Sequence, residues 1–404
     1  MFEPKGRTTV PDLSTLAREI AWPLAILIAW LAGEAVFRWA RLSRISTYGL
    51  AGFLMAGSQF GLLPSSSGPE ILLLAHIAFG LILFEVGYRF NLRWLRANPW
   101  LGVTCLAEAG LTFGAVYLLA LAFDTSRLTA LLLASLSMAT SPATVLRVIN
   151  EHCGSGQVTE RLLHLSALNC VLAVFVFKVV VGLAVFRTSG NLGDAISSSL
   201  HLLLLSAALG VVPGLLMPTL LRWLGRATQD ATLAFAIAVI ALVALVHALK
   251  LSPVLAALTF GLVARHRRIV MSQTQRNFGP LGDLLAVLLF VFIAATLEWR
   301  VVMAGLGIGL SLVLVRALAK LAGVLLFSHL SGISLHKGLL LGIALGPFSA
   351  FVILVLEQTR YLGINLFDQL APLATAALVL EILGPLLAQS ALFLAHEVQV
   401  KGDH

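Results

Sequence analysis

The fold is decided by a stretch that interrupts an apolar segment, Ala134-Ser-Leu-Ser-Met-Ala-Thr-Ser-Pro-Ala-Thr-Val145. Pro142 removes one backbone donor and strains the turn before it, and beside Ser and Thr it can open a short unwound stretch. A second apolar segment, about half the chain away, is interrupted in the same way: Leu341-Gly-Ile-Ala-Leu-Gly-Pro-Phe-Ser-Ala-Phe351. The two stretches predict a pair of discontinuous helices.

The composition places both interruptions inside a membrane protein. Of 404 residues, 59% are apolar and only 11% are charged, whereas a water-soluble domain carries roughly 25% charged residues. So few polar residues could not cover that much apolar surface in water, which excludes a soluble fold. We therefore predict an all-α polytopic protein with about thirteen transmembrane helices, near residues 20–40, 47–63, 69–90, 98–123, 127–149, 161–186, 196–221, 230–249, 251–264, 280–297, 302–326, 335–357 and 370–394.

The lysines and arginines indicate how the chain is oriented. Of 27 in total, sixteen lie at the ends of segments or in the loops on the side reached after odd-numbered segments, and eight lie on the opposite side. The other three, Lys178, Arg316 and Lys320, lie deep within segments. Because these residues favour cytoplasmic loops, we predict an outside N-terminus, a cytoplasmic C-terminus and a multi-pass location in the cell (inner) membrane. The net charge of +8 is then mostly an orientation signal. No polar domain is expected that would bind nucleic acid.

The two interrupted segments enter the predicted membrane from opposite sides. This is the arrangement of a transporter built from inverted repeats, with its substrate site where two discontinuous helices cross near the midplane. Unwound backbone survives in a bilayer only where protein or a water-filled cavity surrounds it. On these segments alone, a pair of ordinary proline kinks is the alternative.

Six patches in order along the chain resemble the monovalent cation:proton antiporter superfamily, most closely its Kef-like and sodium:proton exchanger branches. The most informative are Met138-Ala-Thr-Ser-Pro-Ala-Thr-Val-Leu-Arg-Val-Ile-Asn-Glu151 and Leu165-Ser-Ala-Leu-Asn-Cys-Val-Leu-Ala-Val174, in the fifth and sixth predicted segments. The other four are Phe79–Leu92, Ser252–Val263, Asp283–Ile293 and Leu378–Leu387.

The resemblance implies one transmembrane domain over residues 1–404, assembled as a homodimer in the lipid bilayer. Residues of about 20–95 and 230–300 would form a scaffold. Residues of about 98–190 and 302–394 would form a core that moves as a rigid body and exchanges Na⁺ or K⁺ for protons. The implied ion or substrate site lies at the two breaks and contains Thr140, Ser141, Asn169, Cys170, Gly346 and Ser349.

The chain departs from this family where the family carries its acids. Asn169 matches the family's asparagine, but Cys170 stands where active antiporters have the aspartate that binds either the cation or protons. A thiol is a poor ligand for sodium or potassium, which prefer oxygen. Leu165 replaces the family's glutamate, and Ser141 replaces an acid often found in the first break. The coupling residues are therefore expected to be non-standard.

Charged residues inside the core segments are the remaining candidates. Arg316 and Lys320 share one helix face at the family's basic position, and Lys178 adds a third cation. Each buried charge costs at least about 2.5 kcal/mol, so each needs an acid or a cavity. Glu108 and Glu381 are interpreted either as their counter-ions or as a displaced ion or proton site. Because arginine stays charged, we expect Arg316 to hold the ion pair and a lysine to be more weakly paired.

Three functions stay open at this stage. The first, which the family resemblance favours and which we take as the prediction, is monovalent cation:proton antiport with a relocated carboxylate. The second is transport of an anion or a neutral solute, which the surplus of core cations favours at the half-helix N-termini. The third is a non-transporting membrane module that assembles with or regulates a partner. The sequence offers no nucleophile with its base, phosphate loop or zinc spacing, so no enzyme, cofactor or metal site is expected.

Overall fold

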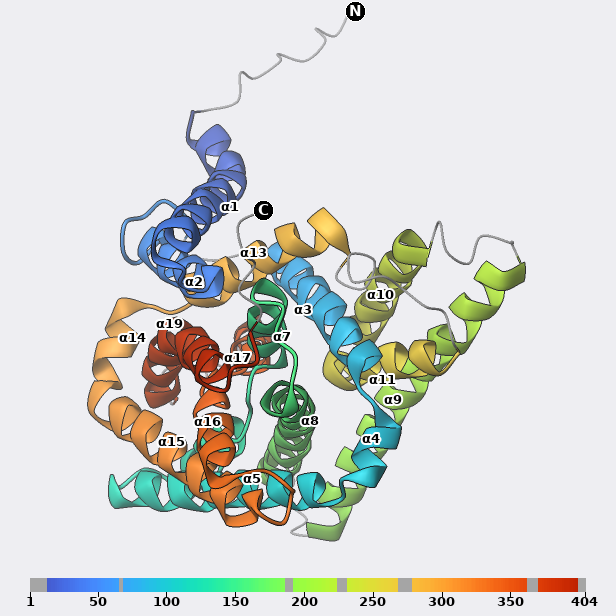
Figure 1. Cartoon of the computed structure of the whole chain (residues 1–404). Helices are drawn as coiled ribbons and strands as arrows, with labels where there is room; N and C mark the ends of the chain where they lie inside the picture. The colour runs from blue at the N-terminus through green and yellow to red at the C-terminus, as the bar shows by residue number, and fades with distance from the viewer. Residues whose placement is uncertain are drawn as a thin grey trace, which may run out of the picture.

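The computed structural model describes residues 13–64, 68–185, 192–223, 231–267, 278–361 and 370–398. Within these ranges the chain forms α-helices, turns and one isolated β-bridge (Figure 1), which confirms the predicted all-α class. Eight helices are long and apolar enough to cross a membrane: α1 (Leu13–Ala40), α3 (Pro69–Arg89), α5 (Trp100–Ala122), α8 (Gln157–Val185), α9 (Leu192–Trp223), α10 (Ala231–Ala248), α15 (Leu306–Ser328) and α19 (Ala371–Leu394). The protein is therefore a multi-pass membrane protein.

Shorter helices complete the described part of the chain: α2 (Arg44–Met55), α4 (Leu92–Ala97), α6 (Arg127–Ser137), α7 (Pro142–Glu151), α11 (Pro253–His266), α13 (Gly279–Ala295), α14 (Trp299–Ala304), α16 (Leu335–Ala344) and α17 (Ala350–Tyr361). Three of the predicted spans correspond to α2, α11 and α13, which have fewer than the roughly 20 residues of a full span. The count of thirteen spans and the orientation of the termini stay predictions. Seven residues of the charge count lie outside the described residues: Lys5, Arg7, Arg187, Arg226, Arg268, Arg276 and Lys401.

The two interrupted segments are each a pair of half-helices, as predicted. α6 ends at Ser137 and α7 begins at Pro142, while α16 ends at Ala344 and α17 begins at Ala350. Serine side chains cap three of the four halves, because a short oxygen acceptor satisfies a free N–H of the first turn. They are Ser126 before α6, Ser141 before α7 and Ser334 before α16.

The unwound stretches cross and bind each other. Thr140 and Phe348 form an antiparallel bridge, and the Ser141 N–H donates to the Pro347 carbonyl at 3.1 Å. The Thr140 hydroxyl donates to the Leu345 carbonyl at 3.3 Å. These bonds satisfy backbone groups that have no partner within either half-helix. The two unwound stretches thus form a defined, hydrogen-bonded crossing, and the alternative of two ordinary proline kinks is wrong.

The helices pack in two groups around this crossing (Figure 1). In one group, α15 packs against α5, α16 and α19, and α6 packs against α5 and α8. In the other, α11 packs against α3 and α9, and α13 packs against α2 and α3. The main contacts between the groups are those of α2 with α19, of α8 with α9, and of α3 with α7 and α17. The crossing therefore lies in the first group, on the side that faces the second.

Large apolar side chains remain exposed on the outer helices. Examples are Leu204 and Leu216 on α9 and Leu233 and Ile237 on α10, each more than half exposed. Such a surface would be costly in water, but it matches the hydrocarbon of a bilayer. The exterior is therefore apolar, whereas the crossing of the two breaks is buried and carries polar side chains.

Candidate functional site

Backbone carbonyls at the two breaks lose their helical partners, and Arg316 of α15 binds four of them. Its Nε donates to the Ser137 carbonyl at 2.9 Å and its Nη1 donates to the Gly346 carbonyl at 2.8 Å. Its Nη2 donates to the carbonyls of Ala139 and Pro347 at 2.9 and 3.4 Å. A planar guanidinium with five donors suits this task. The prediction that Arg316 would hold the ion pair with an acid is therefore wrong.

The ion pair belongs to Lys320, one helical turn further along α15. The Lys320 Nζ lies 2.8 Å from Glu108 Oε2 and also donates to the Met138 carbonyl at 3.0 Å. Both charged side chains are at most 1% exposed. The helices approach closely because Gly323 faces the Glu108 backbone, where an added Cβ would lie 2.3 Å from the Glu108 Cα. The expectation that Arg316 or Lys320 pairs with Glu108 or Glu381 is confirmed for Lys320 and Glu108, whereas the choice of Arg316 as the paired cation was wrong.

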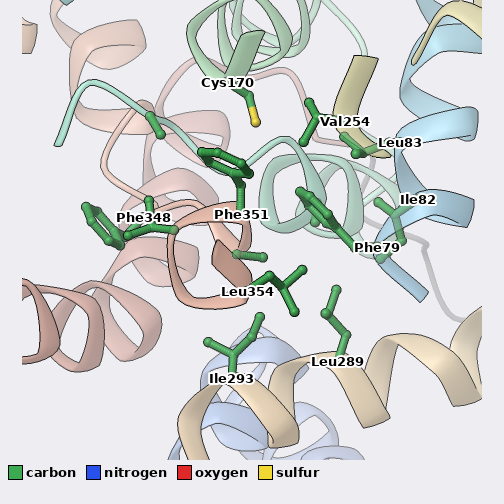
Figure 2. Close-up of a cluster of buried hydrophobic side chains, with 14 of the residues drawn as sticks. Phe79, Ile82, Leu83, Cys170, Val254, Leu289, Ile293, Phe348, Phe351 and Leu354 are labelled. Carbon is green, nitrogen blue, oxygen red and sulfur yellow. The ribbon is translucent and has the colours of Figure 1, made fainter. Parts of the chain in front are cut away.

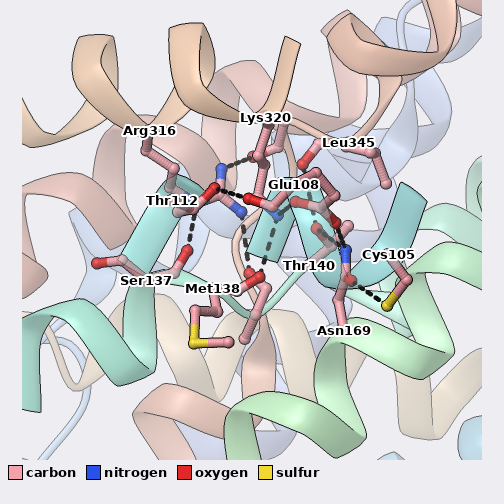
Figure 3. Close-up of polar contacts among 12 residues, drawn as sticks. Cys105, Glu108, Thr112, Ser137, Met138, Thr140, Asn169, Arg316, Lys320 and Leu345 are labelled. Atoms are coloured by element: carbon pink, nitrogen blue, oxygen red, sulfur yellow. Dashed lines mark hydrogen bonds and ion pairs between the residues drawn. The ribbon is translucent and has the colours of Figure 1, made fainter. Parts of the chain in front are cut away.

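Asn169 of α8 connects this ion pair to the first break (Figure 3). Its Nδ2 donates to Glu108 Oε1 and lies 3.5 Å from the Thr140 hydroxyl oxygen. Its Oδ1 accepts from the Cys105 thiol at 3.1 Å. The Glu108 carboxylate is therefore held by an ammonium on one side and an amide on the other, beside the unwound backbone at Thr140.

Cys170 follows Asn169 directly, but it faces a different part of the molecule. Its sulfur lies 3.7 Å from the Ser349 hydroxyl oxygen. Figure 2 shows that it otherwise points into an apolar cluster formed by α3, α11, α13 and α17, with Phe351 and Val254 nearby. All of the labelled side chains in this cluster are buried. Where the family carries its carboxylate, this chain has an apolar contact between the two helix groups.

Ser141, Glu381 and Lys178 lie outside the polar network. The Ser141 hydroxyl caps α7 and accepts from the N–H and hydroxyl of Thr144. Glu381 is buried on α19 against Gly49 of α2, with one carboxylate oxygen unpartnered among the described residues. No ion pair joins Glu381 or Lys178 to an opposite charge in the described part of the chain. The interpretation of Glu381 as a counter-ion is therefore wrong.

Cys105 and the carbonyls of Met138 and Ala139 belong to the site and were not expected from the sequence. Cys105 lies three residues before Glu108, so it shares a helix face with that acid; this spacing could have identified it. The carbonyls could have been inferred from the break itself, since the last carbonyls of any helix lack intrahelical donors.

The comparisons with known proteins agree with this fold. The family model "Sodium/hydrogen exchanger, transmembrane" matches residues 24–392. The fold is similar to the sodium proton antiporter MjNhaP1 from Methanocaldococcus jannaschii at pH 8, with a TM-score of 0.69 and 18% identity over 95% of this chain and 99% of that chain. A second structure of MjNhaP1, from electron microscopy, gives a TM-score of 0.74 and 19% identity over 96% and 100%. No match was found among proteins of curated function.

Proposed function

The chain belongs to the sodium/hydrogen exchanger family, and on this premise we propose that it exchanges a monovalent cation, Na⁺ or K⁺, for protons. The observation that carries the proposal is the buried Glu108 carboxylate at the helix breaks, bound to Lys320 and Asn169. Asn169 is the neighbour of the position that lacks the family's aspartate. In this proposal, Glu108 of α5 supplies the negative charge that α8 does not supply at position 170.

The groups around Glu108 suit competition between a cation and a proton. The carboxylate, the Thr140 hydroxyl and the Met138 carbonyl present oxygen ligands of the kind that hard cations prefer. Lys320 neutralises the carboxylate while it carries a proton. When a cation binds Glu108, the ammonium becomes an uncompensated buried charge, and lysine can lose its proton where arginine cannot. One cation would then enter as one proton leaves Lys320, while Arg316 keeps the breaks in place.

We assign the movement to the two helix groups. Residues of about 20–95 and 230–300 form the scaffold of a homodimer, and residues of about 98–190 and 302–394 form the core that carries the site across the membrane. The apolar contact around Cys170 supports this assignment, because apolar side chains (Figure 2) have few directional bonds that a sliding motion would break. The proposed location is the inner membrane with the C-terminus in the cytoplasm.

A second candidate is exchange or uniport of an anion. The polar network contains two buried cations, Arg316 and Lys320, and one buried carboxylate, Glu108. That surplus of positive charge would be neutralised by an anionic substrate. The apolar surroundings of Cys170 also leave the usual cation position without an oxygen-rich ligand set.

A flux assay with purified protein in proteoliposomes tests the proposal. A pH gradient is imposed, and the internal pH is followed after addition of sodium, potassium, lithium or an anion at a constant salt concentration. Antiport predicts cation-dependent loss of the gradient that Glu108→Gln abolishes. Glu70→Gln, an exposed carboxylate at the start of α3, serves as the matched control and should behave as wild type. Anion-dependent flux would favour the second candidate, and no flux with any ion would favour a non-transporting module.

A further inference from the structure

One polar face of α7 contacts three separate parts of the other helix group. Arg147, Asn150 and Glu151 lie three and four residues apart, so their side chains share one side of the helix. Arg147 contacts the start of α13, Asn150 contacts the end of α3, and Glu151 contacts Ser43 just before α2. We call these three residues the latch face.

Arg147 binds the start of α13 through two hydrogen bonds. Its Nη1 donates to Asp283 Oδ1 at 2.6 Å, and its Nη2 donates to the Gly282 carbonyl at 2.6 Å. The Arg147 side chain is 10% exposed, whereas that of Asp283 is 67% exposed. A buried guanidinium is thus anchored to an accessible carboxylate of the opposite group, and charge-assisted bonds of this kind are stronger than neutral ones.

Asn150 and Glu151 extend the contact along the same turn of α7. The Asn150 amide donates to Glu85 Oε1 at 3.0 Å and its oxygen accepts from Arg89 Nη2. The Ser43 hydroxyl donates to Glu151 Oε2 at 2.9 Å. All three latch-face residues line a cavity of about 330 Å³ between α1, α2, α7 and α13. The seam between the two groups is therefore polar here and apolar around Cys170.

α7 links the latch face to the helix breaks. The helix begins at Pro142, directly after the unwound stretch that binds Pro347. From there to the latch face the rise is at most about 15 Å, at 1.5 Å per residue. A continuous helix of this length moves as one body, so any displacement of the crossing must displace Arg147 from Asp283.

We propose that the latch face holds the core against the scaffold on the side of this cavity. Its bonds would then set the balance between the state described here, in which they are formed, and a state in which the breaks open toward the cavity. This inference rests on the moving core of the proposed function. Arg147 and Asn150 are then positioning residues: they touch no substrate, but they must release before the breaks can open toward this side.

The buried thiol of Cys170 provides a built-in reporter, because it is fully buried at the seam in this state. The experiment measures labelling of Cys170 by a membrane-impermeant maleimide, added to each side of the membrane in turn and quantified on the Cys170 peptide by mass spectrometry. The test variant is Asp283→Asn, with Asn150→Ala as a second variant. The matched control is Glu34→Gln, since Glu34 lines the same cavity but pairs with Arg38 and Arg44 within its own group.

Loss of a charge-assisted bond should shift the balance on the order of tenfold. We expect Asp283→Asn and Asn150→Ala to raise the Cys170 labelling rate from the cavity side by about that factor, and Glu34→Gln to leave it unchanged. Unchanged labelling in both latch variants would overturn the latch, even if cation flux is present. Increased labelling in a protein without cation flux would support the latch and refute only the proposed antiport. Equal increases in the control and the latch variants would also overturn it, because the effect would then belong to the cavity.

Discussion

Glu108→Gln is the substitution that tests the site most directly. Gln has nearly the shape of Glu, and its amide oxygen can still accept from Asn169 Nδ2, as Glu108 Oε1 does. What it removes is the negative charge beside Lys320 Nζ, which lies 2.8 Å from the carboxylate. Lys320 then keeps one bond, to the Met138 carbonyl at 3.0 Å, and is left as an uncompensated charge in the centre of the core.

The expected cost follows from the burial of both partners. Removing one member of a buried ion pair destabilises a protein by about 3–5 kcal/mol, while replacing both by uncharged residues of similar volume is often neutral. Glu108→Gln alone should therefore lower the free energy of unfolding by about 3 kcal/mol or more. Lys320→Met alone should cost less, because the isolated carboxyl can take up a proton. The double variant should recover most of the loss.

The assay is a double-mutant cycle on detergent-purified protein, with unfolding followed by denaturant or heat and flux measured in parallel. We expect a favourable coupling energy of about 2–3 kcal/mol between the two positions and no exchange activity in any of the three variants. A double variant that is as unstable as the sum of the single ones would refute the ion pair. A stable double variant with wild-type flux would show that coupling does not depend on Glu108.

Three further predictions use the same measurements. Glu381→Gln should change the free energy of unfolding by less than about 1 kcal/mol and preserve flux, because no described cation pairs with this acid. Loss of flux with intact folding would instead identify Glu381 as a second coupling carboxylate. Cys170→Asp should destabilise the protein and move the pH profile of exchange, since it buries a new titrating group among apolar side chains, whereas Cys170→Ser should resemble wild type. Burial raises the pKa of Glu397, but bonds from the backbone N–H groups of Val158 and Thr159 and from the Thr159 hydroxyl outweigh it and hold the pKa below its usual value. The Glu397 carboxylate therefore stabilises the fold at pH values above its pKa in the unfolded protein, and this stabilisation is lost as the pH falls through its pKa in the folded protein. Glu397→Gln should then lower the free energy of unfolding at neutral pH and differ less from wild type at acidic pH.

The sequence determined the membrane class and the two breaks, because these depend on local chemistry. Apolar composition sets the solvent in which a chain folds, and a proline beside Ser, Thr or Gly cannot continue a helix. Asn169, Cys170 and the lack of a carboxylate at positions 165 and 170 of α8 could also be read directly from the sequence. The crossing of the breaks also followed from their placement in two halves of the chain.

Only the tertiary structure decided which charges meet. Arg316 and Lys320 lie on the same face of α15, one turn apart, so no periodicity distinguishes them. The choice depends on a displacement of about 6 Å along the helix. That displacement is set by where α5 crosses α15 at Gly323 and by where the free carbonyls of the breaks lie. Arg316 meets the carbonyls and Lys320 meets Glu108.

The same limit applies to direction around a helix. Asn169 and Cys170 are adjacent in sequence, yet about 100° of rotation per residue sends one into the polar network and the other into the apolar seam. The contact of Arg147 with Asp283 joins residues far apart in sequence. Nothing in the sequence around either residue predicts that the two pair. Local chemistry specifies each helix and its interruptions, whereas ion pairs between helices depend on angles and offsets that exist only once the helices are packed.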